Sequence, residues 1–259
     1  MYVPSHFEEQ RVEVLHQLIR ERPLATLVTL GSGVLNANHI PFELDAEPAP
    51  FGTLHGHVAR ANPVWRDFSG EVDALLIFHG PQTYVSPSWY PTKNDTGEVV
   101  PTYNYIVVHA SGAMKIVHDR EWLRGLVTRL TRRFESDRAA PWHVTDAPPP
   151  FIDKQLAAIV GIEIPIAKLI GKWKVSQNRP AVDRGARSRR LLGTAAGRGI
   201  GRLGRRRLLV HRQGQAGEDV ALGARYGQPF QVGQILEQVG GRLVTVLRLL
   251  LQHAAKDHA

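Results

Sequence analysis

The segment from Leu54 to Trp65 holds the residues best suited to bind an anion. A predicted strand ends at Arg60, directly before Asn62-Pro63, which is a typical helix start with Asn as N-cap and Pro at the first helical position. Free N–H groups and the positive end of a helix dipole favour a phosphate there, and a guanidinium can bind it as well. The alternative is a solvated arginine beside an ordinary N-cap, and this segment alone favours that alternative.

Two histidines of the same segment, His55 and His57, lie two residues apart on the predicted strand and so face the same way. A metal site needs a third and usually a fourth ligand, and the sequence marks out none. The chain has no cysteine, which excludes disulfides, thiolate metal sites and a cysteine nucleophile. We therefore expect no metal site, and we assign no catalytic residue.

Two further segments combine aromatic rings or apolar runs with hydrogen-bonding side chains. Residues 80–91 place Tyr84, Ser86 and Trp89 among three prolines, which offers flat stacking surfaces next to a hydroxyl group. A proline-stiffened turn with partly buried rings is an equally good interpretation. In the strand predicted from residue 101, Asn104 lies on an otherwise apolar face and needs a partner in backbone, water or ligand. A structural asparagine paired with the backbone is the favoured interpretation.

Residues 171–180 gather cations and amides around one tryptophan. In an extended chain Lys172 and Lys174 share one face, and Val175 and Gln177 share the other. This pattern indicates anion binding or closure over a phosphate or a ring. A solvated, charged strand end is the commoner use of such a run, and both interpretations stay open.

The elements that must position these residues are mainly strands. Strands are predicted over residues 24–30, 34–44, 52–58, 73–78 with 83–85, 101–117 and 160–170. Helices are predicted over 8–21, 62–68 and 120–134, and a last one follows the prolines at 148–150 and ends near residue 158. Gly31-Ser32-Gly33 predicts a hairpin turn, and Asp119 is a candidate N-cap. At least six strands with few helices favour a mainly β (α+β) fold, a β-barrel with helical additions.

Charge and composition divide the chain near Arg184. Residues 1–184 hold 19 Lys and Arg against 20 Asp and Glu, whereas residues 185–259 hold 13 against 4. The whole positive excess therefore belongs to the second part, and the basic net charge of +8 lends no support to DNA binding by the first. We predict two parts, a domain over 1–184 and an Arg-, Gly- and Leu-rich tail over 185–259.

The tail has twelve arginines to one lysine, which is what GC-rich DNA encodes when it is read in a shifted frame. Our hypothesis is a disordered or incidentally helical segment that derives from a frameshift. A basic arm that contacts DNA phosphates is one alternative. Another is an amphipathic helix over 232–253, which Gly240-Gly241 would weaken by about 1 kcal/mol per glycine.

The opening residues 1–10 mix charged and polar side chains and do not read as a signal peptide. No run reaches the ~18 apolar residues of a membrane span, so we expect a cytoplasmic protein without a membrane partner. The sequence has no Walker loop, no Gly-x-Gly-x-x-Gly fingerprint and no recognisable helix-turn-helix.

Five collinear motifs resemble the PaiB family of FMN-binding negative transcriptional regulators. They are Met1-Tyr-Val-Pro-Ser-His-Phe7, His57-Val-Ala-Arg-Ala-Asn-Pro63, Tyr84-Val-Ser-Pro-Ser-Trp-Tyr90, Val100-Pro-Thr-Tyr-Asn-Tyr105 and Gly171-Lys-Trp-Lys-Val-Ser-Gln-Asn178. The resemblance covers residues 1 to about 184 and stops abruptly there.

This resemblance implies an FMN-binding split β-barrel of the pyridoxamine phosphate oxidase type, a homodimer with flavin at the subunit interface, and a role as a repressor. DNA would be a partner, contacted directly or indirectly. A flavin-dependent oxidoreductase is the alternative, because the fold alone does not decide between them. The flavin phosphate is expected at the turn from His57 to Asn62, and the ring near Asn38 and His39. The cofactor-binding residues implied are Asn38, His39, His57, Arg60, Asn62, Tyr84, Ser86, Trp89, Asn104, Lys172, Lys174, Ser176 and Gln177.

Overall fold

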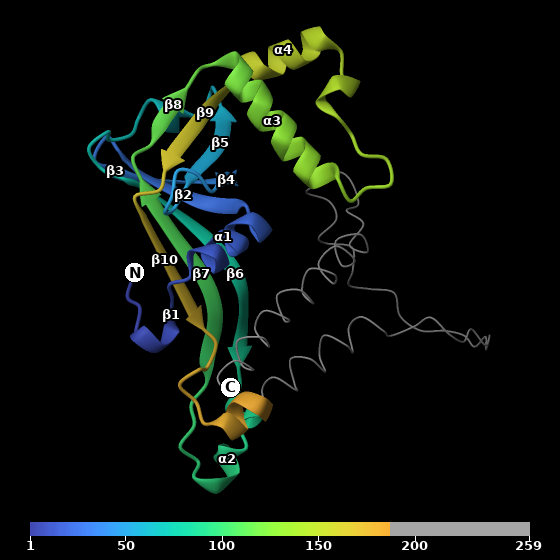
Figure 1. The fold of residues 1–259 in the computed structure, drawn as a ribbon. Coiled ribbons are helices and arrows are strands. Elements are labelled where there is room, and N and C mark those ends of the chain that lie inside the picture. The colour runs from blue at the N-terminus through green and yellow to red at the C-terminus, as the bar shows by residue number, and fades with distance from the viewer. Residues whose placement is uncertain (187–259) are drawn as a thin grey trace, which may run out of the picture. The chain divides into compact units, whose positions relative to one another are not determined.

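The computed structural model describes residues 1–186, and its strands form the two antiparallel sheets seen in Figure 1. The larger sheet has the order β1 (Glu8–Glu9), β10 (Lys168–Lys174), β7 (Thr102–Gly112), β6 (Ala74–Val85), β2 (Leu24–Gly31) and β3 (Val34–Pro41). The smaller sheet has the order β4 (Glu43–Asp45), β5 (Thr53–Ala59), β9 (Ile159–Pro165) and β8 (Lys115–Val117). The predicted mainly β fold with helical additions is confirmed.

Three stretches that were predicted as single strands are each divided between the two sheets. Residues 34–44 become β3 and β4, residues 101–117 become β7 and β8, and the last predicted strand becomes β9 and β10. At the second change of sheet, a Cβ on Gly112 would lie 2.0 Å from the carbonyl oxygen of Pro165, so only glycine permits this close approach of two backbones. These predictions were wrong in extent because a run of β-forming residues carries no sign of which sheet it joins.

Two turns follow the sequence more closely. Ser32 and Gly33 both have positive φ values, 46° and 78°, and make the predicted hairpin between β2 and β3. Strand β6 was predicted to break at Gly80-Pro81, but it continues to Val85 with a shift of register between His79 and Gln82. The prediction of a break was wrong because a β-bulge accommodates the proline.

Alternation of side chains along the strands makes the core. Ala25 and Leu27 of β2 are fully buried, as are Leu76 and Phe78 of β6, and their sequence neighbours are half-buried or exposed. The side chains on the inner face of the larger sheet are therefore buried in the core, whereas those on its outer face along β2 and β6 remain partly exposed to solvent.

The helices of this domain are α1 (Val12–Glu21), α3 (Arg120–Glu135) and α4 (Pro149–Ala157), with 3-10 turns η1 (Ser5–Phe7), η2 (Pro63–Trp65) and η4 (Val144–Asp146). Asp119 caps α3 as predicted, since its Oδ1 accepts a hydrogen bond from the Trp122 N–H over 2.7 Å. The helix predicted from residue 8 starts only at Val12, because Glu8 and Glu9 pair with β10 instead.

The structure separates a second compact unit, which comprises residues 87–99 and, within the described chain, 180–186. It contains η3 (Pro87–Trp89) and α2 (Thr92–Asp95). Asp183 is fully buried and accepts hydrogen bonds from Thr92, 2.8 Å from its Oγ1 and 3.3 Å from its N–H. The tail predicted from residue 185 lies almost entirely outside the described residues. Within residues 1–186 no helix is long and apolar enough to cross a membrane.

Candidate functional site

A chain of three asparagines joins β3 to the turn that follows β5. Asn62 donates from Nδ2 to Oδ1 of Asn38 over 2.8 Å, and Asn38 donates to Oδ1 of Asn36 over the same distance. The Oδ1 of Asn62 accepts the N–H of Val64 at 3.0 Å, which confirms the predicted N-cap. Two of the predicted site residues, Asn38 and Asn62, are thus in direct contact.

The turn that this cap opens is shorter than predicted. The expected helix over 62–68 is a single 3-10 turn, η2, because Asp67 N–H is the last to reach back to the Pro63 carbonyl. A turn of three residues has too few aligned peptides to provide a useful dipole. The turn η2 therefore offers a phosphate no helix dipole.

Arg60 has a structural function at the same place. Its Nε donates to the carbonyl of Ala157 and its Nη2 to the carbonyl of Ile159, both over 2.8 Å. These bonds tie the end of β5 to the start of β9. The guanidinium also lies 6.0 Å from the ring of Trp65, whose Nε1 donates to the Arg60 carbonyl. A role for Arg60 at a phosphate stays a prediction, with two of its five N–H donors engaged elsewhere.

His57 lies on the outer face of the smaller sheet, directly opposite Gly161 of β9. A Cβ on Gly161 would lie 2.5 Å from the ring of Trp122, so the first turn of α3 covers this face. Among the described residues the buried Nδ1 of His57 has no hydrogen-bond partner. Burial lowers the pKa of His57, and burial is also the main cause of the lowered pKa of His55.

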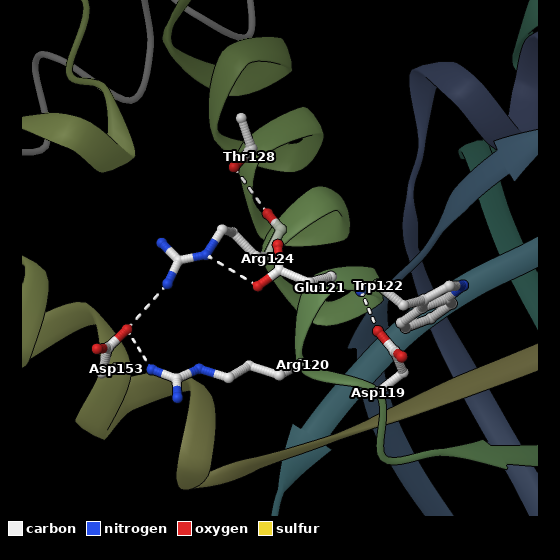
Figure 2. A network of polar contacts seen from close by, with 7 residues as sticks. All are labelled: Asp119, Arg120, Glu121, Trp122, Arg124, Thr128 and Asp153. Carbon is white, nitrogen blue, oxygen red and sulfur yellow. Dashed lines mark hydrogen bonds and ion pairs between the residues drawn. The ribbon is translucent and has the colours of Figure 1, made fainter.

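Figure 2 shows how this covering helix is fixed to α4. Asp153 of α4 forms ion pairs with Arg120 and with Arg124, the latter at 2.9 Å, and Arg124 also approaches Glu121. Arg120 holds the pKa of the Asp153 carboxyl below its usual range, mainly through its hydrogen bond. The network fixes the first turn of α3, and the Trp122 ring of this turn meets the His55 ring edge-on with centroids 5.5 Å apart, a contact that the sequence analysis did not single out.

His39 does not accompany its neighbour Asn38. Asn38 pairs with the buried Leu27 and so shares the inner face of the larger sheet, whereas His39 pairs with Thr26 and lies exposed on the outer face. Alternation along a strand would have placed these consecutive residues on opposite faces.

The second group of predicted residues lies at the far end of β6, β7 and β10. Lys172 and Lys174 share a face as predicted, and their ammonium groups lie 5.4 and 6.0 Å from the ring of Tyr105. Lys174 Nζ donates to Thr102 Oγ1 at 2.7 Å and to the Tyr103 carbonyl at 2.8 Å.

Asn104 is buried, and its amide and the hydroxyl of Ser176 exchange hydrogen bonds of 3.0 and 3.1 Å. A side chain is therefore among its partners, where the sequence favoured the backbone. Ser176 has a φ of 68°, and Gln177 closes the same turn by donating to the Trp173 carbonyl and accepting the Val175 N–H.

Tyr84 and Tyr103 face each other across β6 and β7 with ring centroids 6.4 Å apart, and both rings are about half exposed. They offer a stacking surface, and Tyr103 is a residue that the sequence analysis did not select. Ser86 follows at the end of this strand, half-buried, while Trp89 belongs to the second unit.

The two groups are well apart within one chain. Asn38 pairs with Leu27 of β2, and Leu27 pairs with Leu76 of β6. Tyr84 comes eight residues after Leu76 on β6. At the usual rise per residue this is roughly 25 Å. Lys172 lies four strands away from β3, which is roughly 19 Å at the usual strand spacing.

The chain passes repeatedly between two antiparallel sheets, with helices packed on the outside of the smaller one. This arrangement is that of the split-barrel class of flavoproteins. The flavocytochrome Anf3 from Azotobacter vinelandii has this fold, with a TM-score of 0.50 and 13% identity over 85% of this chain and 90% of that one. This likeness concerns the fold alone.

The family described as "Putative FMN-binding domain" matches residues 1–168. "Protease synthase and sporulation protein PAI 2" of Bacillus subtilis is 31% identical over 183 residues, 71% of this chain and 85% of its own length. An uncharacterized protein of Aspergillus fumigatus is 32% identical over 247 residues, 77% of this chain and 95% of its own length. The chain therefore belongs to the PaiB family of FMN-binding proteins, and FMN is its cofactor.

The side chains present fit such a ligand. The exposed rings of Tyr84 and Tyr103 can stack on a flat heteroaromatic ring, and lysines on the neighbouring strand β10 can bind a phosphate. Among the described residues no group of three or more His, Cys, Asp or Glu could hold a metal ion.

Proposed function

We propose that this protein is an FMN-binding regulator of transcription that acts as a cytoplasmic homodimer. The observation that carries the proposal is its 31% identity to the PAI 2 protein, whose name refers to protease synthesis and sporulation. Protease synthesis and sporulation are different processes, and control of gene expression explains an effect on both better than one enzymatic step would. Its effect on DNA is direct or runs through a partner protein.

The separation of the two residue groups supports the homodimer. Asn38 and Asn62 lie at one edge of the barrel, and Tyr84 and Lys174 lie at the far end of the long strands. One flavin can contact both groups only if the second group comes from another copy. We propose that two equivalent FMN sites form in this way, one at each end of a twofold interface.

The outer face of the larger sheet has the character of such an interface. Val28, Leu75 and Ile77 project from it and are only half-buried, and on the edge strand Leu35 is 73% exposed. Soluble chains rarely leave a contiguous apolar face of this kind in water. A second copy of the same face would bury it.

In this arrangement Asn38 and Asn62 of one copy face the flavin together with Tyr84, Ser86 and Lys174 of the other, and His39 lies on the outer face toward the partner copy. Arg60 and His57 support the turn beneath it, and Asn104, Ser176 and Gln177 shape the far end. FMN supplies a ring that accepts and releases electrons, so its redox state is a signal that the regulator can sense.

The proposal is tested with the purified full-length protein and DNA from upstream of its own gene. We expect a dimer by light scattering, a flavin spectrum, and salt-sensitive binding to that DNA in excess of an unrelated fragment. A yellow protein that binds no DNA and whose spectrum bleaches rapidly with a reduced nicotinamide cofactor would instead be an oxidoreductase.

A further inference from the structure

A row of charged side chains crosses the four strands of the smaller sheet, with a histidine near its centre. Glu43 of β4 lies directly opposite His55 of β5, and His55 lies opposite Glu163 of β9. Glu163 in turn lies opposite Lys115 of β8. Residues that pair directly across strands project from the same face of a sheet, so these four side chains form one charge row on the face that α3 covers.

The members of the charge row are paired to different degrees. Arg129 of α3 donates from Nε to Oε2 of Glu43 over 2.8 Å. The Nζ of Lys115 lies 3.6 Å from Oε1 of Glu163. The Nε2 of His55 lies at the same distance from the other carboxylate oxygen of Glu163, which is longer than a hydrogen bond. The pair of His55 and Glu163 is therefore poised to tighten when the imidazole gains a proton.

Burial opposes that proton. The His55 side chain is only 13% exposed, and burial is the main cause of its lowered pKa, with the charge of Arg129 acting in the same direction. Nearby carboxylates offset this effect only in part, and they are those of Glu163, Glu43 and Asp45. His57, the next residue on this face of β5, also has a pKa that burial lowers. An imidazolium at His55 thus has acids beside it but lacks water.

The first turn of α3 is part of what keeps water away from His55. The Trp122 ring of this turn meets the His55 ring edge-on, with centroids 5.5 Å apart and an interplanar angle of 85°. The ion pairs at this end of α3 lead away from the sheet, because Arg120 and Arg124 both pair with Asp153 of α4 (Figure 2). This turn can therefore leave the sheet without breaking them.

Helix α4 would move together with this end of α3. Leu123 of α3 packs with Ile152 and Leu156 of α4 in a small buried cluster. Arg120 holds the pKa of Asp153 below its usual range, mainly through its hydrogen bond, so the ion pairs between the helices persist in mildly acidic solution. The start of α3 and α4 form one body that rests on the charge row.

We infer that His55 is a proton-controlled switch, whose protonation moves Trp122 and the first turn of α3 away from the smaller sheet. In the open form water reaches the imidazolium, while Glu43 and Glu163 remain on either side of it. This response to acid is separate from the flavin and does not depend on the proposed function.

The proton favours the open form only because that form binds it more tightly. Each unit by which the pKa of His55 is higher in the open form shifts the equilibrium by up to about tenfold. Opening therefore begins as the pH falls below the ordinary histidine value of about 6.5, and it increases until the pH reaches the lowered pKa of the closed form.

Acrylamide quenching of tryptophan fluorescence in the full-length protein tests this switch. The contribution of Trp122 is the difference between each protein and its own Trp122→Phe form, measured with equal flavin content. We expect the quenching constant of Trp122 to increase about twofold between about pH 7.5 and about pH 5.5 as the ring becomes accessible. The far-UV circular dichroism should stay unchanged over this range.

Three variants assign the effect. His55→Gln cannot take up the proton, so its quenching constant should stay the same over this range. His79→Gln is the matched control, at an exposed histidine of the larger sheet, and should respond as wild type does. Glu163→Gln removes one of the acids beside His55, so its transition should move to lower pH.

An equal increase in His55→Gln and wild type would overturn the inference, as would an unshifted transition in Glu163→Gln. Constant quenching of Trp122 in wild type over this range would overturn it too. An increase that coincides with loss of the circular dichroism signal would also do so, because global unfolding would then expose the ring. None of these results bears on the proposed function, which FMN and DNA binding test separately.

Discussion

Asn62 and Asn38 are joined by a hydrogen bond of 2.8 Å between residues 24 positions apart, and this bond connects the two sheets at the polar edge of the barrel. Asn38 belongs to β3 of the larger sheet, while Asn62 follows β5 of the smaller one. Because the same Asn62 side chain caps η2, one residue fixes both the turn and its distance from β3.

Replacing Asn62 by Ala removes both bonds. We expect the free energy of unfolding to decrease by about 1 kcal/mol for the lost cap, and somewhat more for the unpaired amide of Asn38. Urea unfolding measures the change. Asn178→Ala, at an exposed asparagine, is the control and should change stability little. Equal stability of the two variants would show that the Asn62 bonds contribute nothing.

The half-buried His57 predicts a dependence of stability on pH. Burial lowers its pKa in the folded protein below the ordinary value of about 6.5, so the unfolded chain binds the proton more readily. The stabilisation is therefore complete above about pH 6.5 and is lost as the pH falls through the lowered pKa of the folded state. His57→Phe should show a smaller loss of unfolding free energy between pH 8 and pH 5, in series of denaturant titrations at fixed pH. If the unfolding free energy of His57→Phe changed with pH as it does in wild type, His57 would not contribute to the pH dependence of stability.

Gly161 tests the packing of the first turn of α3 on β9. A methyl group at this position meets Trp122 at 2.5 Å and Val117 at 3.0 Å, so the indole must move. We expect Gly161→Ala to destabilise the protein by about 1–3 kcal/mol, as for overpacked cores. Gly70→Ala is the matched control, since nothing lies within 4 Å of its added Cβ. Thermal unfolding of both variants would contradict the account if their midpoints matched.

The ion pairs of Asp153 in Figure 2 give a prediction about salt. Asp153→Asn removes the partner of Arg120 and Arg124, and it should lower the melting temperature slightly in dilute buffer. The difference from wild type should shrink in 1 M NaCl, because salt screens exposed pairs. A difference that is independent of salt would point to lost packing between α3 and α4.

Local features of the fold could be predicted because their causes lie within a few residues. The hairpin at Ser32-Gly33, the Asp119 cap and the shared face of Lys172 and Lys174 each depend on spacing or on turn chemistry alone. Stretches that change sheets could not be predicted, since the deciding contact is between distant backbones, as at Gly112 and Pro165.

The candidate site follows the same division. The cap by Asn62 was predictable, but its bond to Asn38 depends on how β3 and β5 meet. Arg60 was expected to bind a phosphate. Its hydrogen bonds to two carbonyls could not be predicted, because the carbonyls lie 97 and 99 residues further along the chain.

The central claim is that two copies of the chain complete each FMN site, and mixed dimers test it most directly. Asn38→Leu disables the first residue group and Lys174→Met the second, so each variant alone should bind little FMN. After unfolding and refolding together, half of the dimers are mixed and carry one intact site, which predicts about a quarter of the wild-type FMN capacity. A mixture that binds no more FMN than the separate variants would show that each site lies within one chain.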